Sequence, residues 1–194
     1  MEIQFRTQFG ELLEHLGLKG DAVEIGVAEG RNALSIIQSP QIEKLYLIDS
    51  WKELPQRGDG GFPQDWHDIN LRVAQETLEP YKEKAIWLRG LSQDMIDSIP
   101  DNSLVLAYLD GDHSYAGFTS DLQRIYSKVK VGGVIAGHDY LSPAYGINKG
   151  VKHFVFDSGQ YLMSDIHQTE EGGDDSMVSF WFVKKMVEGG NDSI

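Results

Sequence analysis

Short apolar runs recur along the chain, and segments with a helical spacing of apolar residues separate them. The runs predict strands at Ala22–Gly26, Lys44–Ile48, Ala85–Arg89, Leu104–Leu109, Gly133–His138, Tyr161–Ser164 and Val178–Lys184. The first five runs are nearly continuous in apolar residues rather than alternating, which is typical of parallel strands that are buried on both faces. We therefore expect a largely parallel sheet with helices on both sides.

The segments between these runs predict helices at Arg31–Ile37, Asp68–Tyr81, Ser92–Ile99, Tyr115–Lys128 and Asn148–Phe156. Because strands and helices alternate, the chain is expected to form an α/β fold with an open, doubly wound sheet. A further helix at Thr7–Leu16 precedes the first strand and ends near Gly17 and Gly20, whose backbone tolerates positive φ. We expect this N-terminal helix to pack over the site or over an edge of the sheet.

Length and local composition bear on the domain organisation. A chain of 194 residues suits one hydrophobic core, so we expect a single domain over residues 1–194, with the N-terminal helix inside residues 1–20. Residues 51–66 contain several glycines and prolines and form either a lid or binding loop, or a plain disordered insertion. The polar residues 186–194 are expected to form a flexible tail.

Composition and charge exclude several classes of function. No apolar run approaches the roughly 20 residues of a membrane span, and the N-terminus lacks the pattern of a signal peptide. We therefore expect a cytoplasmic protein without a membrane partner. The absence of cysteine excludes disulfides and thiolate chemistry. A net charge of −13 argues against a nucleic-acid partner, because affinity for nucleic acid depends largely on Lys and Arg.

A glycine-containing turn follows the first predicted strand. The sequence Val23-Glu24-Ile25-Gly26-Val27-Ala28-Glu29-Gly30 runs from this strand into the next helix, and such turns bind ligands in doubly wound sheets. The spacing departs from the G-x-G-x-x-G fingerprint of dinucleotide-binding proteins, because Ala28 occupies the position of the middle glycine. The turn therefore disfavours an NAD-dependent oxidoreductase.

An acidic residue, Asp49, ends the second predicted strand. A carboxylate there can accept hydrogen bonds from both hydroxyls of a ribose, although Asp49 is alternatively a helix cap or turn former. Ser92, which follows the third strand, lies either beside an adenine edge or at the N-cap of the next helix. The candidate cofactor-binding residues are Glu24, Gly26, Val27, Gly30, Asp49, Ser50, Ser92 and Asp110.

Acidic and histidine residues follow the fourth and fifth predicted strands. Because these strands end at the same edge of the sheet, Asp110, His138 and Asp139 are candidate metal ligands. Carboxylates suit Mg²⁺, whereas an imidazole shifts the preference toward Mn²⁺. His113 is a candidate general base and, with Asp110, a candidate catalytic residue, since an imidazole pKa of about 6.5 lies near working pH. Alternatively, His113 only caps the next helix, or a bound metal makes a protein base unnecessary.

The motifs around these residues resemble those of the class I S-adenosylmethionine-dependent methyltransferases. Within that class the chain is similar to the small-domain group that includes macrolide-sugar O-methyltransferases and cephalosporin-hydroxylase-like proteins. The resemblance runs from about Ala22 to Lys185. It rests on the first turn quoted above, Leu47-Ile48-Asp49-Ser50-Trp51, Leu109-Asp110-Gly111-Asp112-His113-Ser114-Tyr115, Gly132-Gly133-Val134-Ile135-Ala136-Gly137-His138-Asp139-Tyr140 and Phe180-Trp181-Phe182-Val183-Lys184-Lys185.

The resemblance implies a Rossmann-like, seven-stranded, mostly parallel sheet with an antiparallel last strand. It also implies S-adenosylmethionine over Gly26 and Gly30, with its ribose on Asp49. Related sugar and catechol O-methyltransferases bind Mg²⁺ through an acid that matches Asp110 and an acidic or acid-amide pair that matches His138-Asp139. The histidine of this pair departs from their pattern, which leaves the choice between Mg²⁺, Mn²⁺ and no metal open.

The function that the resemblance implies is O-methylation of a small-molecule acceptor, such as a sugar or a secondary metabolite. The acceptor would be selected by residues 51–66, the N-terminal helix and Ser142–Asn148. The alternatives are a non-catalytic partner protein that binds S-adenosylmethionine and an NAD-dependent oxidoreductase. A homodimer would be unsurprising for a small enzyme.

Overall fold

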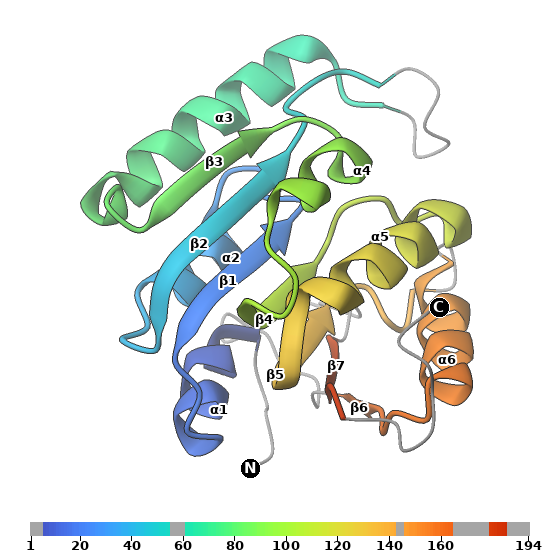
Figure 1. Ribbon diagram of the computed structural model, residues 1–194. Coiled ribbons are helices and arrows are strands. Elements are labelled where there is room, and N and C mark those ends of the chain that lie inside the picture. The colour runs from blue at the N-terminus through green and yellow to red at the C-terminus, as the bar shows by residue number, and fades with distance from the viewer. Residues whose placement is uncertain (1–5, 55–60, 143–145, 165–178, 186–194) are drawn as a thin grey trace.

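The computed structural model describes residues 6–54, 61–142, 146–164 and 179–185 (Figure 1). Within these ranges the strands form one sheet in the order β3-β2-β1-β4-β5-β7-β6. The strands are β1 (Gly20–Ile25), β2 (Ile42–Asp49), β3 (Ala85–Arg89), β4 (Leu104–Leu109), β5 (Val129–Gly137), β6 (Met163–Ser164) and β7 (Phe180–Val183). Strands β1 to β5 pair in parallel, whereas β7 is antiparallel to both β5 and β6. The predicted α/β fold, with a mostly parallel sheet and an antiparallel last strand, is confirmed.

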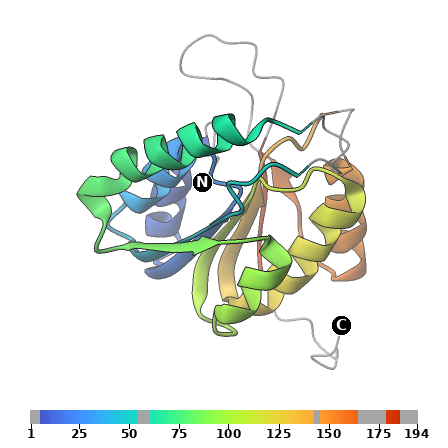
Figure 2. The same ribbon diagram turned by 90° about the horizontal axis from the view of Figure 1, so that it is seen from above.

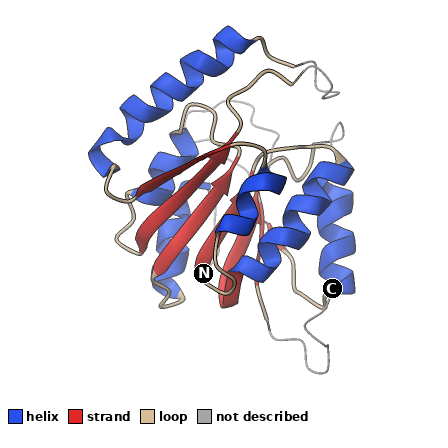
Figure 3. Cartoon of the chain, turned by 45° about the horizontal axis from the view of Figure 1, so that its top comes forward, coloured by secondary structure: helices blue, strands red, loops and turns tan. Residues whose placement is uncertain are grey.

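Helices cover both faces of the sheet (Figure 2 and Figure 3). They are α1 (Phe9–His15) after the 3₁₀ turn η1 (Arg6–Gln8), α2 (Arg31–Ile37), α3 (Gln64–Leu78) with η2 (Glu79–Tyr81), α4 (Ser92–Met95) with η3 (Ile96–Ser98), α5 (Tyr115–Lys128) and α6 (Ile147–Asp157). Side chains of α1, α2 and α3 pack in one core with Tyr108, and those of α4, α5 and α6 pack in a second core with Leu109. Neighbouring residues of a strand point to opposite faces, so burial on both faces explains the unbroken apolar sequence of β4.

Several predicted bounds differ from the observed ones. Helix α3 begins at Gln64 rather than at Asp68, with Pro63 at its N-cap, so the irregular loop is shorter than residues 51–66. Strand β5 begins at Val129, before the predicted start at Gly133, and it runs through a register shift relative to β4. The edge strand β6 has only two described residues, Met163–Ser164. The predictions for Val178 and for the tail at 186–194 lie outside the described residues.

The N-terminal helix packs against one face of the sheet, not over an edge. Phe9 of α1 is buried and meets Tyr108 of β4 edge-on, with ring centroids 5.5 Å apart. Gly10 lies so close to Ser39 that an added Cβ would come within 2.9 Å of the serine side chain. Among the helices of the described ranges, none has the length and apolar character that crossing a membrane requires.

Candidate active site

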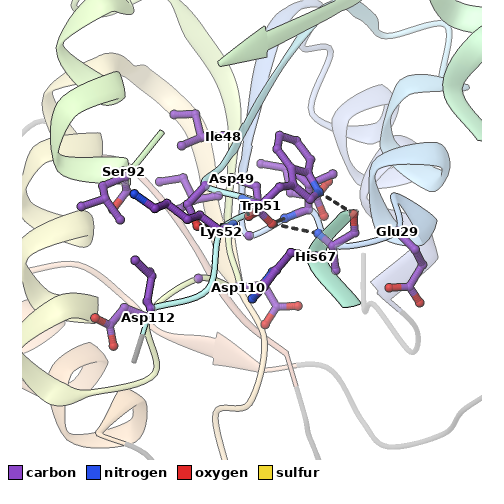
Figure 4. A pocket seen from close by; sticks show the side chains of 18 of the residues that line it. Glu29, Ile48, Asp49, Trp51, Lys52, His67, Ser92, Asp110 and Asp112 are labelled. Atoms are coloured by element: carbon purple, nitrogen blue, oxygen red, sulfur yellow. Dashed lines mark hydrogen bonds between the residues drawn. The ribbon is translucent and has the colours of Figure 1, made fainter. Parts of the chain in front are cut away.

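A cavity of about 400 Å³ lies at the carboxyl edge of the sheet, where the turns after β1 to β4 meet (Figure 4). The candidate cofactor residues that line it are Glu24, Gly26, Val27, Asp49, Ser50, Ser92 and Asp110. The candidate base His113 lines it as well. Gly30 stands apart from this lining: it is the N-cap of α2, with φ of 82°, and packs against Ala74 of α3. The structure thus brings the predicted cofactor residues together, except for Gly30.

The carboxylate of Asp49 ties the turn after β1 to the end of β2. Its Oδ2 accepts hydrogen bonds from the backbone N–H groups of Val27 at 2.9 Å and Ala28 at 3.0 Å. Its Oδ1 accepts a hydrogen bond from the N–H of Trp51 at 2.8 Å. Ala28 and Trp51 have φ angles of 46° and 41°, which are uncommon outside glycine. Asp49 therefore has the turn-forming role, and only its remaining lone pairs are left for ribose hydroxyls.

Gly26 allows β1 and β4 to approach each other at their ends. Its φ is 85°, and an added Cβ would overlap the backbone carbonyl of Asp110. The N–H of Asp110 donates to the carbonyl oxygen of Ile25 at 2.7 Å. A side chain at position 26 would push these segments apart, so the glycine keeps Asp110 beside the turn.

Glu24 places a buried carboxyl group in the wall of the cavity. Its Oε1 accepts a hydrogen bond from the side-chain amide of Asn32 at 2.8 Å, and Oε2 has no partner among the described residues. Burial raises the pKa of Glu24 to about 8; the hydrogen bond from Asn32 opposes this rise, and the charges of Asp110 and Asp49 add to it. A buried oxygen without a donor is costly. The site therefore suits a ligand that brings an N–H or O–H donor to this oxygen.

Ser92 is not an N-cap. Leu91 occupies the N-cap of α4, and Ser92 is the first helical residue. The hydroxyl group of Ser92 donates to Oδ1 of the buried Asp121 at 2.6 Å. The N-cap hypothesis is therefore wrong, and Asp121 fixes the position of Ser92 in the cavity wall.

Asp110, His113 and Asp139 form a cluster at the ends of β4 and β5. Each offers one atom of a type that binds metals, and these atoms lie within 4.8 Å of one another. Nε2 of His113 is 3.3 Å from Oδ1 of Asp110 and 3.3 Å from Oδ2 of Asp139. The predicted metal set was Asp110, His138 and Asp139. The structure places His113, instead of His138, between the two carboxylates.

His138 contacts the other oxygen of Asp139. Its Nδ1 lies 3.1 Å from Oδ1 of Asp139, so it supports that carboxylate from outside the cluster. Burial disfavours the charged form of His138, but the hydrogen bond to Asp139 and the charges of Asp110 and Asp139 outweigh it and raise its pKa. Asp139 has a φ of 58°, so the directions of its neighbours do not follow the alternation of the strand.

The residues around His113 do cap α5, but His113 itself does not. Oγ of Ser114 accepts a hydrogen bond from the N–H of Gly117 at 3.1 Å. The N–H of Ser114 in turn donates to Oδ1 of Asp112 at 2.9 Å. The capping hypothesis therefore applies to Ser114 and Asp112, and the His113 ring is directed toward the two acids of the cluster.

Sequence reasoning missed an aromatic group in the cavity lining. The rings of Phe62 and Trp66 stack with centroids 4.1 Å apart and planes 16° apart, and His67 meets Trp66 edge-on. Trp66 and His67 reach this position because α3 starts early. The available signal was Pro63, since proline is common where helices begin. Gln64 holds the segment in place by exchanging hydrogen bonds of 3.1 Å and 3.3 Å with Glu53.

Comparison with solved structures shows which proteins share this fold. The O-methyltransferase NovP is 20% identical, with a TM-score of 0.66 over 93% of this chain and 78% of NovP. An O-methyltransferase from Bacillus cereus, solved in complex with SAH, is 12% identical, with a TM-score of 0.64 over 92% of this chain and 80% of its own. An rRNA methylase from Streptococcus thermophilus is 12% identical, with a TM-score of 0.63 over 92% of this chain and 95% of its own.

Comparison with protein families concerns the sequence itself. The chain's sequence has no match among curated proteins. The sequence model of a family described as "Methyltransferase domain" matches residues 23–140. This range contains the turn after β1, Asp49 and the Asp110–His113–Asp139 cluster. The chain therefore belongs to this family of methyltransferase domains, which confirms the class I S-adenosylmethionine-dependent methyltransferase that its motifs predict.

Proposed function

We propose that this methyltransferase transfers the methyl group of S-adenosylmethionine to a hydroxyl oxygen of a small molecule, such as a sugar or another secondary metabolite. The observation that carries the proposal is that Asp110 and His113 belong both to the cavity lining and to the cluster with Asp139. One cavity thus joins a site of nucleoside-binding type to groups that can accept a proton or hold a cation. The resemblance to O-methyltransferases supports oxygen as the methylated atom.

The residues present fit S-adenosylmethionine. The unpartnered Oε2 of Glu24 suits the ammonium group of the methionine part, which brings the donor that this oxygen lacks. Asp49 and Ser50 lie where a ribose would meet the end of β2, and Ser92 lies in the wall expected to face adenine. When bound, the cofactor supplies a methyl group on a sulfonium that is already a good leaving group. Alignment is therefore the main task of the chain's own residues.

The acidic cluster offers two ways to deal with the proton of the acceptor hydroxyl, and both use Nε2 of His113. As a base, Nε2 takes up the proton, and the carboxylates of Asp110 and Asp139 hold the resulting cation by ion pairing. As a metal ligand, the same nitrogen would hold a divalent cation together with the two carboxylates, and the cation would supply positive charge that favours release of the hydroxyl proton to solvent. Two carboxylates and one imidazole suit Mn²⁺ better than Mg²⁺. We infer that the second use applies.

The stacked pair of Phe62 and Trp66 supports a small acceptor with one apolar face. Phe62 is 56% exposed, and both rings line the cavity that His113 also lines. Aromatic rings of this kind pack against sugar C–H groups or against another ring. A net charge of −13 speaks against RNA as the acceptor, although an rRNA methylase shares the fold. A homodimer and a cytoplasmic location stay predictions.

Calorimetric titration of the purified protein with S-adenosylmethionine and with NAD⁺, each with and without Mn²⁺ or Mg²⁺, tests the proposal. We expect S-adenosylmethionine to bind and Asp49→Ala to weaken it. Incubation with methyl-labelled cofactor and a panel of sugars and phenols then identifies the acceptor. Absence of S-adenosylmethionine binding under every condition would contradict the proposal. Binding of NAD⁺ would instead support the alternative of an NAD-dependent oxidoreductase. Binding without transfer to any acceptor would favour the non-catalytic partner protein.

A further inference from the structure

Arg6 lines the same cavity as Glu24, although it lies outside residues 23–140, which the family model matches. It belongs to η1, ahead of the N-terminal helix, and is partly buried. Within the described ranges, no hydrogen bond or ion pair engages its side chain. Its charge is close enough to lower the pKa of Glu24, against the stronger effect of burial. The cavity therefore holds a guanidinium group with all of its donors available near a buried acid.

The other cations of the cavity lining are more exposed or already paired. Nε of Arg31 lies 3.0 Å from Oε1 of Glu29, and the Arg31 side chain is 81% exposed. Lys52 is also exposed. Of the lysines and arginines that the structure describes in the cavity lining, Arg6 is thus the one best shielded from solvent, where an ion pair with a ligand is strongest.

The backbone amides of the turn after β1 are largely committed to the protein itself. The N–H groups of Val27 and Ala28 donate to Asp49, and that of Gly26 donates to the carbonyl oxygen of Ile48 at 2.9 Å. The N–H of Gly30 donates to the carbonyl oxygen of Val27 at 2.8 Å. These four amides are therefore not free to hold an anionic group of a ligand, and a side-chain donor such as a guanidinium group can hold it instead.

We propose that Arg6 binds the α-carboxylate of the cofactor's methionine part, opposite the ammonium group that faces Glu24. The inference rests on the proposed use of S-adenosylmethionine. A guanidinium group matches a carboxylate with two parallel N–H donors, which a lysine cannot do. Arg6 and Glu24 together recognise the amino acid as a zwitterion. The site consequently selects nucleosides that carry the complete amino acid over truncated or decarboxylated ones.

The test compares ligands that differ only at this end. S-adenosylhomocysteine carries both charges, decarboxylated S-adenosylmethionine lacks the carboxylate, and 5′-methylthioadenosine lacks the amino acid altogether. Dissociation constants are measured by calorimetry for the wild-type protein, Arg6→Ala and Arg6→Lys. The matched control is Arg31→Gln, which removes a positive charge from the same cavity lining at an exposed position.

We expect Arg6→Ala to weaken S-adenosylhomocysteine on the order of 10- to 100-fold, the usual effect of losing a hydrogen-bonded ion pair. The affinities for the decarboxylated cofactor and for 5′-methylthioadenosine should stay unchanged, which also shows that the variant is folded. Arg6→Lys should restore part of the loss, and Arg31→Gln should not discriminate between the ligands.

Two results would overturn the inference alone: equal weakening of all ligands by Arg6→Ala, and no weakening of any. Failure of the wild-type protein to bind S-adenosylhomocysteine would overturn the cofactor assignment together with the inference.

Discussion

The side-chain amide of Asn32 donates to Oε1 of Glu24 at 2.8 Å, and this is the one hydrogen bond that the buried carboxyl group makes within the described residues. The neighbouring charges of Asp110 and Asp49 are negative, so the ionised form of Glu24 is poorly stabilised until a ligand arrives. This relationship makes the stability of the ligand-free protein depend on the protonation of one side chain.

Glu24→Gln should change how stability depends on pH. The folded-state pKa of Glu24 is about 8, against an ordinary value of 4.5, so the folded protein keeps a proton that the unfolded chain releases as pH rises. The contribution of Glu24 to the free energy of unfolding therefore falls between these two pH values, by roughly 2–4 kcal/mol. The variant, which cannot ionise and can still accept from Asn32, should gain stability relative to wild type over this range. Denaturant titrations at a series of pH values measure the difference in unfolding free energy between the variant and the wild type. A difference that does not change with pH would contradict the raised pKa of Glu24.

Gly26→Ala should be far more damaging than Gly132→Ala. Both glycines have a φ of 85°, so both substitutions meet the same backbone strain. An added Cβ at Gly26 overlaps the carbonyl of Asp110, whereas at Gly132 it meets nothing within 4 Å. We expect a loss of about 1–2 kcal/mol at Gly132, from backbone strain alone. Loss at Gly26 should be several kcal/mol larger, because backbone cannot move aside cheaply. Equal losses of unfolding free energy would show that the ends of β1 and β4 tolerate separation.

Asp49→Ala should destabilise the protein even without a ligand. The substitution leaves the N–H groups of Val27, Ala28 and Trp51 without their acceptor. We expect a loss of roughly 2–4 kcal/mol in the free energy of unfolding, with partial recovery in Asp49→Asn, which keeps one acceptor oxygen. Chemical denaturation of both variants checks this order. Wild-type stability of Asp49→Ala, combined with lost cofactor binding, would mean that Asp49 serves the ligand alone.

Mn²⁺ binding should depend on Asp110, His113 and Asp139 and not on Asp112. The first three place ligand atoms within 4.8 Å of one another, whereas Asp112 is engaged with the N–H of Ser114. Substituting Asn for either acid, or Ala for His113, should abolish Mn²⁺ binding measured by electron paramagnetic resonance. Asp112→Asn, so near in sequence, should bind the ion as the wild type does. If His138→Ala abolishes binding and His113→Ala does not, the originally predicted ligand set is the correct one.

The interior strands could be predicted from sequence because burial on both faces leaves a local signature. Strands β3 and β4 have the predicted bounds, since their apolar runs coincide with the paired residues. The predicted bounds of β2 and β5 are too narrow because polar residues, such as Glu43 and Lys130, interrupt the apolar run at a register shift just after the paired first residues Ile42 and Val129. A run of apolar residues indicates which residues of a strand are buried. The hydrogen-bonded pairing between strands extends beyond that run.

The candidate site could be predicted as a set of neighbouring turns, but not in its pairings. Topology alone brings Asp49, Asp110 and Asp139 to one edge of the sheet. These pairings involve residues with positive φ angles, since Asp139 contacts both histidines and Ala28 donates to Asp49. L-residues rarely adopt such backbone angles, so no sequence rule anticipates them. Arg6 lies beyond the matched motifs, and only the packing of η1 reveals it.

The placement of β7 between β5 and β6 has a consequence for synthesis on the ribosome. Residues Val134–Gly137 of β5 pair with β7, which is synthesised long after strands β1 to β5. Until Phe180–Val183 emerge, the outer edge of β5 is open to pairing with other chains, and open strand edges promote misassembly. Asp139 lies two residues beyond that strand end, so in a nascent chain β1 to β4 can pair with one another before β7 fixes the strand that carries this acid.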